Sequence, residues 1–107
     1  MSELTVAKVM SKMPENFNSE NAAGVDAVIQ FHIEGEEAGD WIVVVKEGTC
    51  EVNEGVSDSP NLTMTADSHD YLDIVAGNLS GMQAVMKGKL QIGGDMGLAM
   101  KFASFFD

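Results

Sequence analysis

The sequence predicts an α+β fold in a single domain that spans residues 1–107. The chain begins with apolar residues at helical spacing, continues through a middle part with strand-like alternation, and ends in a half that is rich in helix signals. Strands that follow one another, rather than alternating with helices, are typical of the α+β class. A chain of 107 residues has the length of one domain and can build one hydrophobic core.

The charge balance is strongly acidic. Six lysines stand against 17 aspartates and glutamates, which gives a formal net charge of −11. A surface of this sign repels the phosphates of nucleic acids and anionic membranes. We therefore expect no nucleic-acid partner, and we attribute the acidic excess mainly to solubility.

Cysteine content and hydropathy favour a cytoplasmic protein. Cys50 is the only cysteine, so the chain cannot form an internal disulfide or a multi-cysteine metal site. The first residues contain no apolar stretch of signal-peptide length, and no segment approaches the roughly 18 apolar residues of a membrane span. The last residues, SFFD, differ from the Ser-Lys-Leu peroxisomal signal. These features predict no stable membrane insertion.

A helix is expected first. Val6, Val9, Met10 and Met13 recur at the spacing of one helix face. Pro14 ends this helix at or before Met13, since the residue before a proline avoids helical geometry.

The middle of the chain predicts four strands. Residues 25–33 alternate between apolar and mostly polar positions, which indicates a strand with one apolar face. Residues 34–40 form a turn. The apolar run at 41–45 favours a central strand that is covered on both faces. Glu47-Gly48 then forms a tight turn into a return strand at 49–53, and a further strand follows at 62–65.

Two short helices are expected next. Asp67 or Ser68 can cap the first, and Gly77 ends it. Ser80 can cap the second, and Gly88 ends it. The predicted buried faces are Leu72, Val75 and Ala76 in the first helix and Met82, Val85 and Met86 in the second.

The last part of the chain predicts a strand at 90–92, a turn at Gly93-Gly94 and a final helix at 96–106 that is capped by Asp95. The apolar residues of this helix form two stripes, one of Leu98, Phe102, Phe105 and Phe106 and one of Met96, Ala99, Met100 and Ala103. A helix that is apolar nearly all round needs cover on nearly all sides. A bound apolar ligand, a second subunit or a membrane surface could supply this cover. Alternatively, the helix packs across the sheet and leaves a few phenylalanine atoms exposed.

Two glycine-rich segments resemble cofactor or nucleophile motifs only superficially. Residues 93–97, GGDMG, depart from the dinucleotide-binding pattern, and Asp95 would put a carboxylate where a pyrophosphate should lie. Residues 77–81, GNLSG, have their serine one place too late for a nucleophile elbow. Both segments are better explained as helix-capping turns.

The titratable residues predict no catalysis and no metal site. His32 and His69 have no partner at metal-ligand spacing, and the acidic turn at 34–40 lacks the EF-hand pattern. Asp70 is explained by its place in the first turn of a helix, where a negative charge is favourable. We therefore expect a protein that is not an enzyme and that needs no cofactor and no metal.

The ordered set of segments resembles the sterol carrier protein 2 (SCP-2) sterol-transfer domain. The run GVDAVIQFHIEGEEAGDWIVVVKEGTCEV at 24–52 is similar to the first three strands of that family. The second half is similar to the family's fourth strand, its helices and the phrase Gly88-Lys89-Leu90-x-Ile92-x-Gly94-Asp95. The resemblance implies a five-stranded mixed β-sheet with helices covering one face, and an apolar tunnel between them. It also implies non-catalytic binding of a sterol, fatty acid, acyl-CoA or other lipid.

We therefore expect the chain to bind and to transfer or present a hydrophobic lipid in a hollow between the sheet and the C-terminal helix. The candidate lining residues are Phe31, Ile33, Met64, Leu72, Val75, Met82, Val85, Met86, Ile92, Met96, Met100, Phe102 and Phe105. Two alternatives remain open. The apolar helix could dock on a second copy or another protein, which allows a homodimer, or the domain could present a substrate to a partner enzyme.

Overall fold

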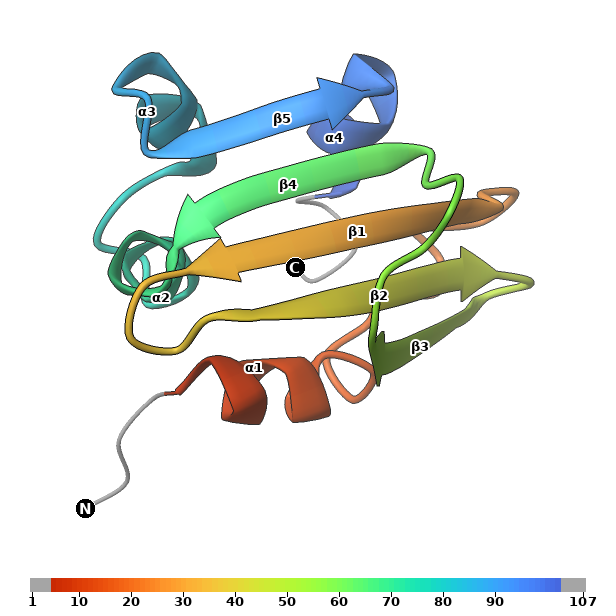
Figure 1. Ribbon diagram of the computed structural model, residues 1–107. Helices are drawn as coiled ribbons and strands as arrows, with labels where there is room; N and C mark the ends of the chain where they lie inside the picture. The colour runs from red at the N-terminus through yellow and green to blue at the C-terminus, as the bar shows by residue number, and fades with distance from the viewer. Residues whose placement is uncertain (1–4, 103–107) are drawn as a thin grey trace.

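The computed structural model describes residues 5–102 and has the expected α+β architecture (Figure 1). Its elements, in chain order, are α1 (Val6–Lys12), β1 (Ala27–Glu34), β2 (Gly39–Lys46), β3 (Thr49–Glu54), β4 (Leu62–Asp67), α2 (Ser68–Val75), α3 (Gly81–Met86), β5 (Leu90–Gly94) and α4 (Met96–Phe102). Each predicted helix and strand is present, with its ends shifted by a few residues. For the final helix, the expected residues 103–106 lie outside the described part.

The five strands form one mixed sheet in the order β3-β2-β1-β4-β5. β1 pairs in parallel with β4, and the other neighbours are antiparallel. The five-stranded mixed sheet implied by the resemblance is therefore confirmed.

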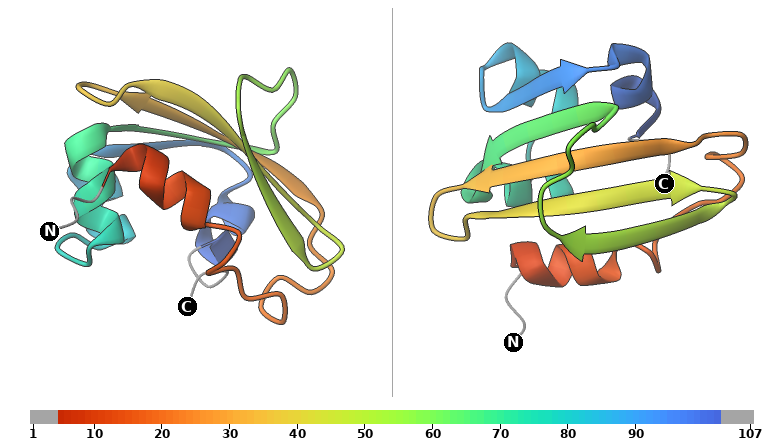
Figure 2. Two further views of the ribbon diagram at one scale, coloured as in Figure 1. Left: turned by 90° about the horizontal axis from the view of Figure 1, so that it is seen from below. Right: turned by 45° about the vertical axis from the view of Figure 1, so that its right-hand side comes forward.

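The concave face of the sheet carries the helices (Figure 2). Ile29, Phe31 and Ile33 alternate along β1, and all three are almost fully buried in the hydrophobic core. α1 contributes Val6 and Met10, both buried in the same core. The core therefore lies between one face of the sheet and the helices, so the prediction of helices on one face is also confirmed.

The prediction that the 41–45 strand is central is confirmed, since β2 is paired on both sides, but the prediction that both of its faces are covered was wrong. β2 lies between β3 and β1, and β1 occupies the middle of the sheet. Val43 and Val45 are buried, but Ile42 and Val44 are only half-buried. The reason is that the other face carries no helix and is crossed only by the connection from β3 to β4, which passes over β2 and β1 (Figure 1).

Local capping chemistry sets the element boundaries. Glu47 and Gly48 both adopt positive φ, 51° and 75°, as a tight hairpin turn between twisted strands requires. The Ser80 side chain accepts from the backbone N–H of Gln83, and the Gln83 side chain bonds back to the Ser80 backbone, which completes a capping box. Asp67, rather than Ser68, caps α2.

Candidate functional site

Three aromatic rings join the sheet to the last helix and to α2. Phe31, at the centre of β1, has its ring centroid 5.7 Å from that of Tyr71 in α2 and 5.7 Å from that of Phe102 in α4. The Phe31–Tyr71 pair is edge-on at 75°, and the Phe31–Phe102 pair is tilted at 52°. Such pairs each contribute about 0.5–1.5 kcal/mol beyond their buried area. Phe31 therefore holds two helices against the middle strand.

Tyr71 was not among the predicted site residues. It is buried, and this burial raises the pKa of its phenol, so the ring is neutral at physiological pH. Tyr71 stands three residues after Ser68, which is also buried, so the two side chains lie on the same face of α2. Both side chains carry a hydroxyl group, so the pattern of apolar residues did not indicate that this face is buried.

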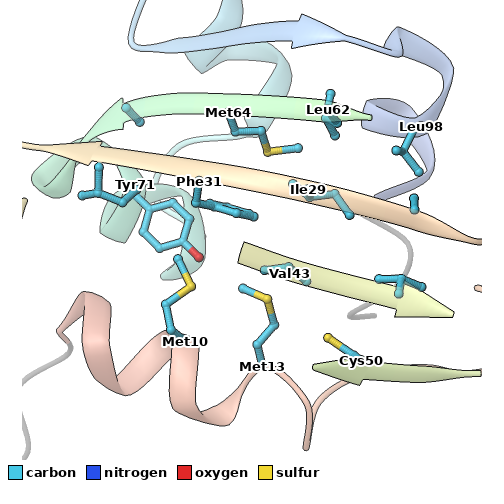
Figure 3. Close-up of a cluster of buried hydrophobic side chains, with 14 of the residues drawn as sticks. Met10, Met13, Ile29, Phe31, Val43, Cys50, Leu62, Met64, Tyr71 and Leu98 are labelled. Carbon is cyan, nitrogen blue, oxygen red and sulfur yellow. The ribbon is translucent and has the colours of Figure 1, made fainter. Parts of the chain in front are cut away.

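Methionines fill the core between α1 and the sheet. Met10 and Met13 extend from α1 toward the strands, and Met64 lies on β4 beside Phe31 and Ile29 (Figure 3). Methionine has three rotatable bonds and a polarizable sulfur, so a core built from it repacks around different apolar shapes at low cost. The interior beside the aromatic rings is therefore deformable.

The structure divides the predicted lining residues into three groups. Phe31, Ile33 and Met64 are buried on the helix-facing side of the sheet. Leu72, Ile92 and Phe102 are half-buried and pack against the core. The exposed residues are Val75, Met82, Val85, Met86, Met96 and Met100. Phe105, also a predicted lining residue, lies outside the described residues.

The predicted inward face of α2 is correct at Leu72, which packs against the core, and wrong at Val75 and Ala76, while the predicted inward face of α3 was wrong. α2 buries Ser68 and Tyr71, whereas Val75 is exposed. In α3 the buried residue is Ala84. α3 has only six residues and buries one of them, so its two methionines remain exposed.

The expected hollow beneath the last helix is filled within residues 5–102. The Phe31 and Phe102 rings touch there, and Leu98 of α4 is buried against the core. Two hollows among the described residues lie elsewhere. One, of about 240 Å³, lies between the start of α1 and the turn before β2, and the other, of about 180 Å³, lies beside Asp67 and Lys89. Neither is an apolar tunnel.

Each histidine lies beside a surface carboxylate. His32 Nδ1 lies 2.5 Å from an Asp40 carboxylate oxygen, and this hydrogen bond is the main cause of the raised pKa of His32. His69 Nε2 lies 3.6 Å from a Glu36 carboxylate oxygen. Among residues 5–102, no three histidine, cysteine, aspartate or glutamate side chains are grouped so that they could hold a metal ion.

The sequence and the fold of this chain match a known family. The family model described as the SCP-2 sterol transfer family matches residues 8–107. The chain belongs to the SCP-2 sterol transfer family. The solution structure of palmitated SCP2L2 from Aedes aegypti supports the assignment, since it has a TM-score of 0.77 and 28% sequence identity, with coverage of 94% of this chain and 93% of that one.

Sequence relatives in the SCP-2 family include much longer proteins. Hydroxysteroid dehydrogenase-like protein 2 from Xenopus tropicalis is 38% identical over 85 residues, which cover 78% of this chain and 20% of that protein. Peroxisomal multifunctional enzyme A from Dictyostelium discoideum is 30% identical over 103 residues, which cover 92% of this chain and 23% of that protein. The chain thus spans about a fifth of the length of these curated relatives. Within the described residues, no helix has the length and apolarity needed to span a membrane.

Proposed function

We propose that this SCP-2 domain binds one apolar lipid tail between its sheet and α4, without covalent chemistry. The observation that carries the proposal is the Phe31–Phe102 contact. It closes a short helix onto the sheet at a point where Phe102 remains only half-buried. Movement of Phe102 away from Phe31 opens an apolar space whose inner wall is Phe31 and Met64.

The predicted lining residues have distinct places in this proposal. Phe31, Ile33 and Met64 form the inner wall, and Leu72, Ile92 and Phe102 form the layer that separates on binding. The outer margin consists of Val75, Met82, Val85, Met86, Met96 and Met100. Phe105 keeps its predicted role from the sequence alone.

The energetics are favourable for a chain of moderate length. Each buried methylene contributes about 0.8 kcal/mol, so about ten methylenes supply roughly 8 kcal/mol before costs. Separation of the Phe31–Phe102 pair costs about 0.5–1.5 kcal/mol, and association and ordering cost more. A micromolar dissociation constant for a fatty acid is consistent with this balance.

Family membership and the relatives support the proposal. The Aedes aegypti structure is that of a palmitated protein, which associates a fatty acid with a relative of the same fold. We propose further that the domain needs no metal and no cofactor, that it binds no nucleic acid and that it acts in the cytoplasm, although one relative is named as peroxisomal.

The test compares two truncations on the same helix. Phe102→Ala removes the half-buried ring, whereas Leu98→Ala removes a buried side chain of the core. We expect Phe102→Ala to weaken binding of a fluorescent fatty acid more than it lowers the free energy of unfolding, and Leu98→Ala to do the reverse. A Phe102→Ala protein that loses stability but keeps full affinity contradicts the proposal. In a separate measurement, native mass spectrometry with lipid extraction identifies any lipid that co-purifies with the wild-type protein.

A second candidate function is the presentation of a bound substrate to an enzyme. It is favoured by the relatives, whose names describe a dehydrogenase-like protein and a multifunctional enzyme of much greater length. Affinity purification of the full chain from its own cells tests it. An enzyme that co-purifies, and that turns over a lipid substrate faster when this domain is added, supports presentation over free transport.

A further inference from the structure

The edge strand β5 lacks the features that usually prevent a strand from pairing further. It lies at one edge of the sheet, and β4 is its only strand neighbour among residues 5–102 (Figure 1). Its sequence, LQIGG, contains no charged residue and no proline. The other edge strand, β3, carries Glu51 and Glu54, and charged side chains oppose pairing at an edge. β5 is therefore the edge of the sheet that is open to a further strand.

The hydrogen bonds between β4 and β5 fix which backbone groups of β5 face outward. The N–H of Asp95, directly after β5, donates to the carbonyl oxygen of Asn61, directly before β4, at 3.0 Å. Because backbone groups alternate in direction along an antiparallel strand, every second residue back from Asp95 also bonds to β4. The residues between them, which include Leu90 and Ile92, direct their backbone groups toward the free edge. These groups are available to another strand.

We propose that β5 pairs antiparallel with β5 of a second copy of the chain, so that the two sheets join into one continuous sheet. The two-fold axis passes beside Ile92, whose outward backbone groups bond to those of Ile92 in the second copy. Leu90 then stands opposite Gly94 of the second copy, so that all of β5 is paired. This dimer does not depend on the proposed lipid site.

Charge complementarity supports a second copy as the partner and selects this register. Lys89 directly precedes β5 and Asp95 directly follows it, so the pairing puts Lys89 of each copy opposite Asp95 of the other. Opposite charges that face each other across two strands stabilise the pairing. The same contact forms twice, once on each side of the two-fold axis.

Both charged groups are free enough to make this contact. The Lys89 Nζ lies 3.8 Å from an Asp70 carboxylate oxygen, and an exposed pair of this kind contributes little. Asp95 is exposed and uses Oδ1 to accept from the backbone N–H of Leu98. Its other carboxylate oxygen can therefore accept from Lys89 of the second copy.

The acidic surface opposes dimers elsewhere more than at β5. Two copies of a chain with a net charge of −11 repel each other in general. Residues 74–94, however, contain two lysines and no acidic residue. The repulsion between two copies is therefore weakest where the two β5 strands meet.

Exposed methionines flank β5 at both ends. α3 ends at Met86, which is 81% exposed, and α4 begins at Met96, which is 53% exposed. The two helices lie at opposite ends of β5 (Figure 1). Antiparallel pairing brings the Met86 end of one β5 to the Met96 end of the other. Burial of part of this apolar surface would add to the stability of the dimer.

Sedimentation equilibrium of the full chain, from micromolar to millimolar concentration, tests the dimer. Pairing through one strand buries little surface, so we expect weak association, with the average mass rising from 11.4 kDa toward twice that value. Lys89→Glu puts like charges opposite each other on both sides of the axis and should weaken association about tenfold or more. Lys87→Glu makes the same charge change at an exposed position two residues away and should weaken it much less.

A second matched pair of variants distinguishes the two edges of the sheet. Gln91 is exposed on β5, and Asn53 is exposed on β3. Gln91→Lys should weaken the dimer, because a lysine on an edge strand opposes pairing, whereas Asn53→Lys should not weaken it. Neither exposed change should alter the thermal melting curve.

Amide hydrogen exchange locates the contact residue by residue. The N–H groups of Gln91 and Gly93 face β4, so they should be protected at every protein concentration. The N–H of Ile92 faces the free edge, so it should exchange rapidly in dilute protein and slowly in concentrated protein. This alternation is the signature of pairing through the β5 edge.

Three results would overturn the proposal. The first is a chain that stays monomeric at millimolar concentration. The second is a dimer that Lys89→Glu and Lys87→Glu weaken equally, and the third is a dimer in which the Ile92 amide remains unprotected. Either of the last two would place the contact between copies elsewhere on the chain.

Discussion

The side chain of Gln30 forms hydrogen bonds with the backbone on both sides of Val56, at Gly55 and Ser57. Gln30 Oε1 accepts from the backbone N–H of Ser57 at 2.7 Å, and its Nε2 donates to the carbonyl oxygen of Gly55 at 3.0 Å. Gln30 lies on the central strand and is buried, although its side chain is on the face of the sheet that carries no helix. One amide thereby fixes the connection between β3 and β4 across the open face.

Replacement of Gln30 with alanine should therefore destabilise the fold without harming the lipid site. The change leaves the Ser57 N–H and the Gly55 carbonyl without their partner, and we expect a loss of about 2–4 kcal/mol in the free energy of unfolding. Urea denaturation measures this loss. Fatty-acid affinity should stay unchanged, because Phe31 and Phe102 lie on the other face. An equal loss of affinity would show that the open face contributes to binding.

The His32–Asp40 pair predicts a pH-dependent stability. Its hydrogen bond raises the folded-state pKa of His32 above the ordinary value of 6.5. The pair therefore contributes its full stability below pH 6.5, and this contribution is lost as pH rises through the folded pKa. The effect should be small, since about half of the His32 side chain is exposed.

Thermal melting of His32→Gln and of the wild type at several pH values checks this sign. The difference between them should be larger at acidic than at alkaline pH, and Asp40→Asn should remove most of the dependence, with a smaller part left by Glu34, whose carboxylate lies 3.8 Å from His32 Nε2. His69→Gln removes the other histidine and serves as the control. A His32→Gln protein with the same pH profile as the wild type would contradict the assignment.

Gly35 should be intolerant of a side chain. It adopts a φ of +92°, and a Cβ atom there would overlap the Asp67 carboxylate and come within 3.3 Å of Ser68 Oγ. Asp67 caps α2 by accepting from the backbone N–H of His69, so the overlap would disturb the start of that helix.

A matched variant separates this overlap from backbone strain. Gly24 also has positive φ, +77°, but a Cβ atom there would have no neighbour within 4 Å. We expect Gly35→Ala to cost about 1–3 kcal/mol more than Gly24→Ala in urea denaturation. Equal costs would show that only the backbone conformation matters at both positions.

The Cys50 thiol should react slowly in the folded protein. Cys50 is buried on β3, and burial raises its pKa to about 11. At pH 8 only about one thiol in a thousand is then ionised, and the thiolate is the reactive form. Reaction with an aromatic disulfide reagent should be slow in buffer and fast in urea. Fast reaction in buffer would show that β3 opens without global unfolding.

Much of the fold follows from short stretches of sequence. Glu47-Gly48, Ser80 and Asp95 gave correct boundaries, because turns and caps depend on hydrogen bonds and steric limits within about four residues. The alternation in β1 likewise predicted its buried face. The family resemblance supplied the mixed sheet, which local patterns alone do not determine.

Only the tertiary structure decided which side of each helix is covered. The methionines of α3 were expected inside, yet Ala84 is the buried residue of this short helix, and Met82 and Met86 are exposed. The contact of Phe31 with both Tyr71 and Phe102 joins three distant parts of the chain, and no local pattern encodes it. Local sequence thus set where elements begin and end, whereas competition among distant side chains for the same limited core decided which residues stay outside.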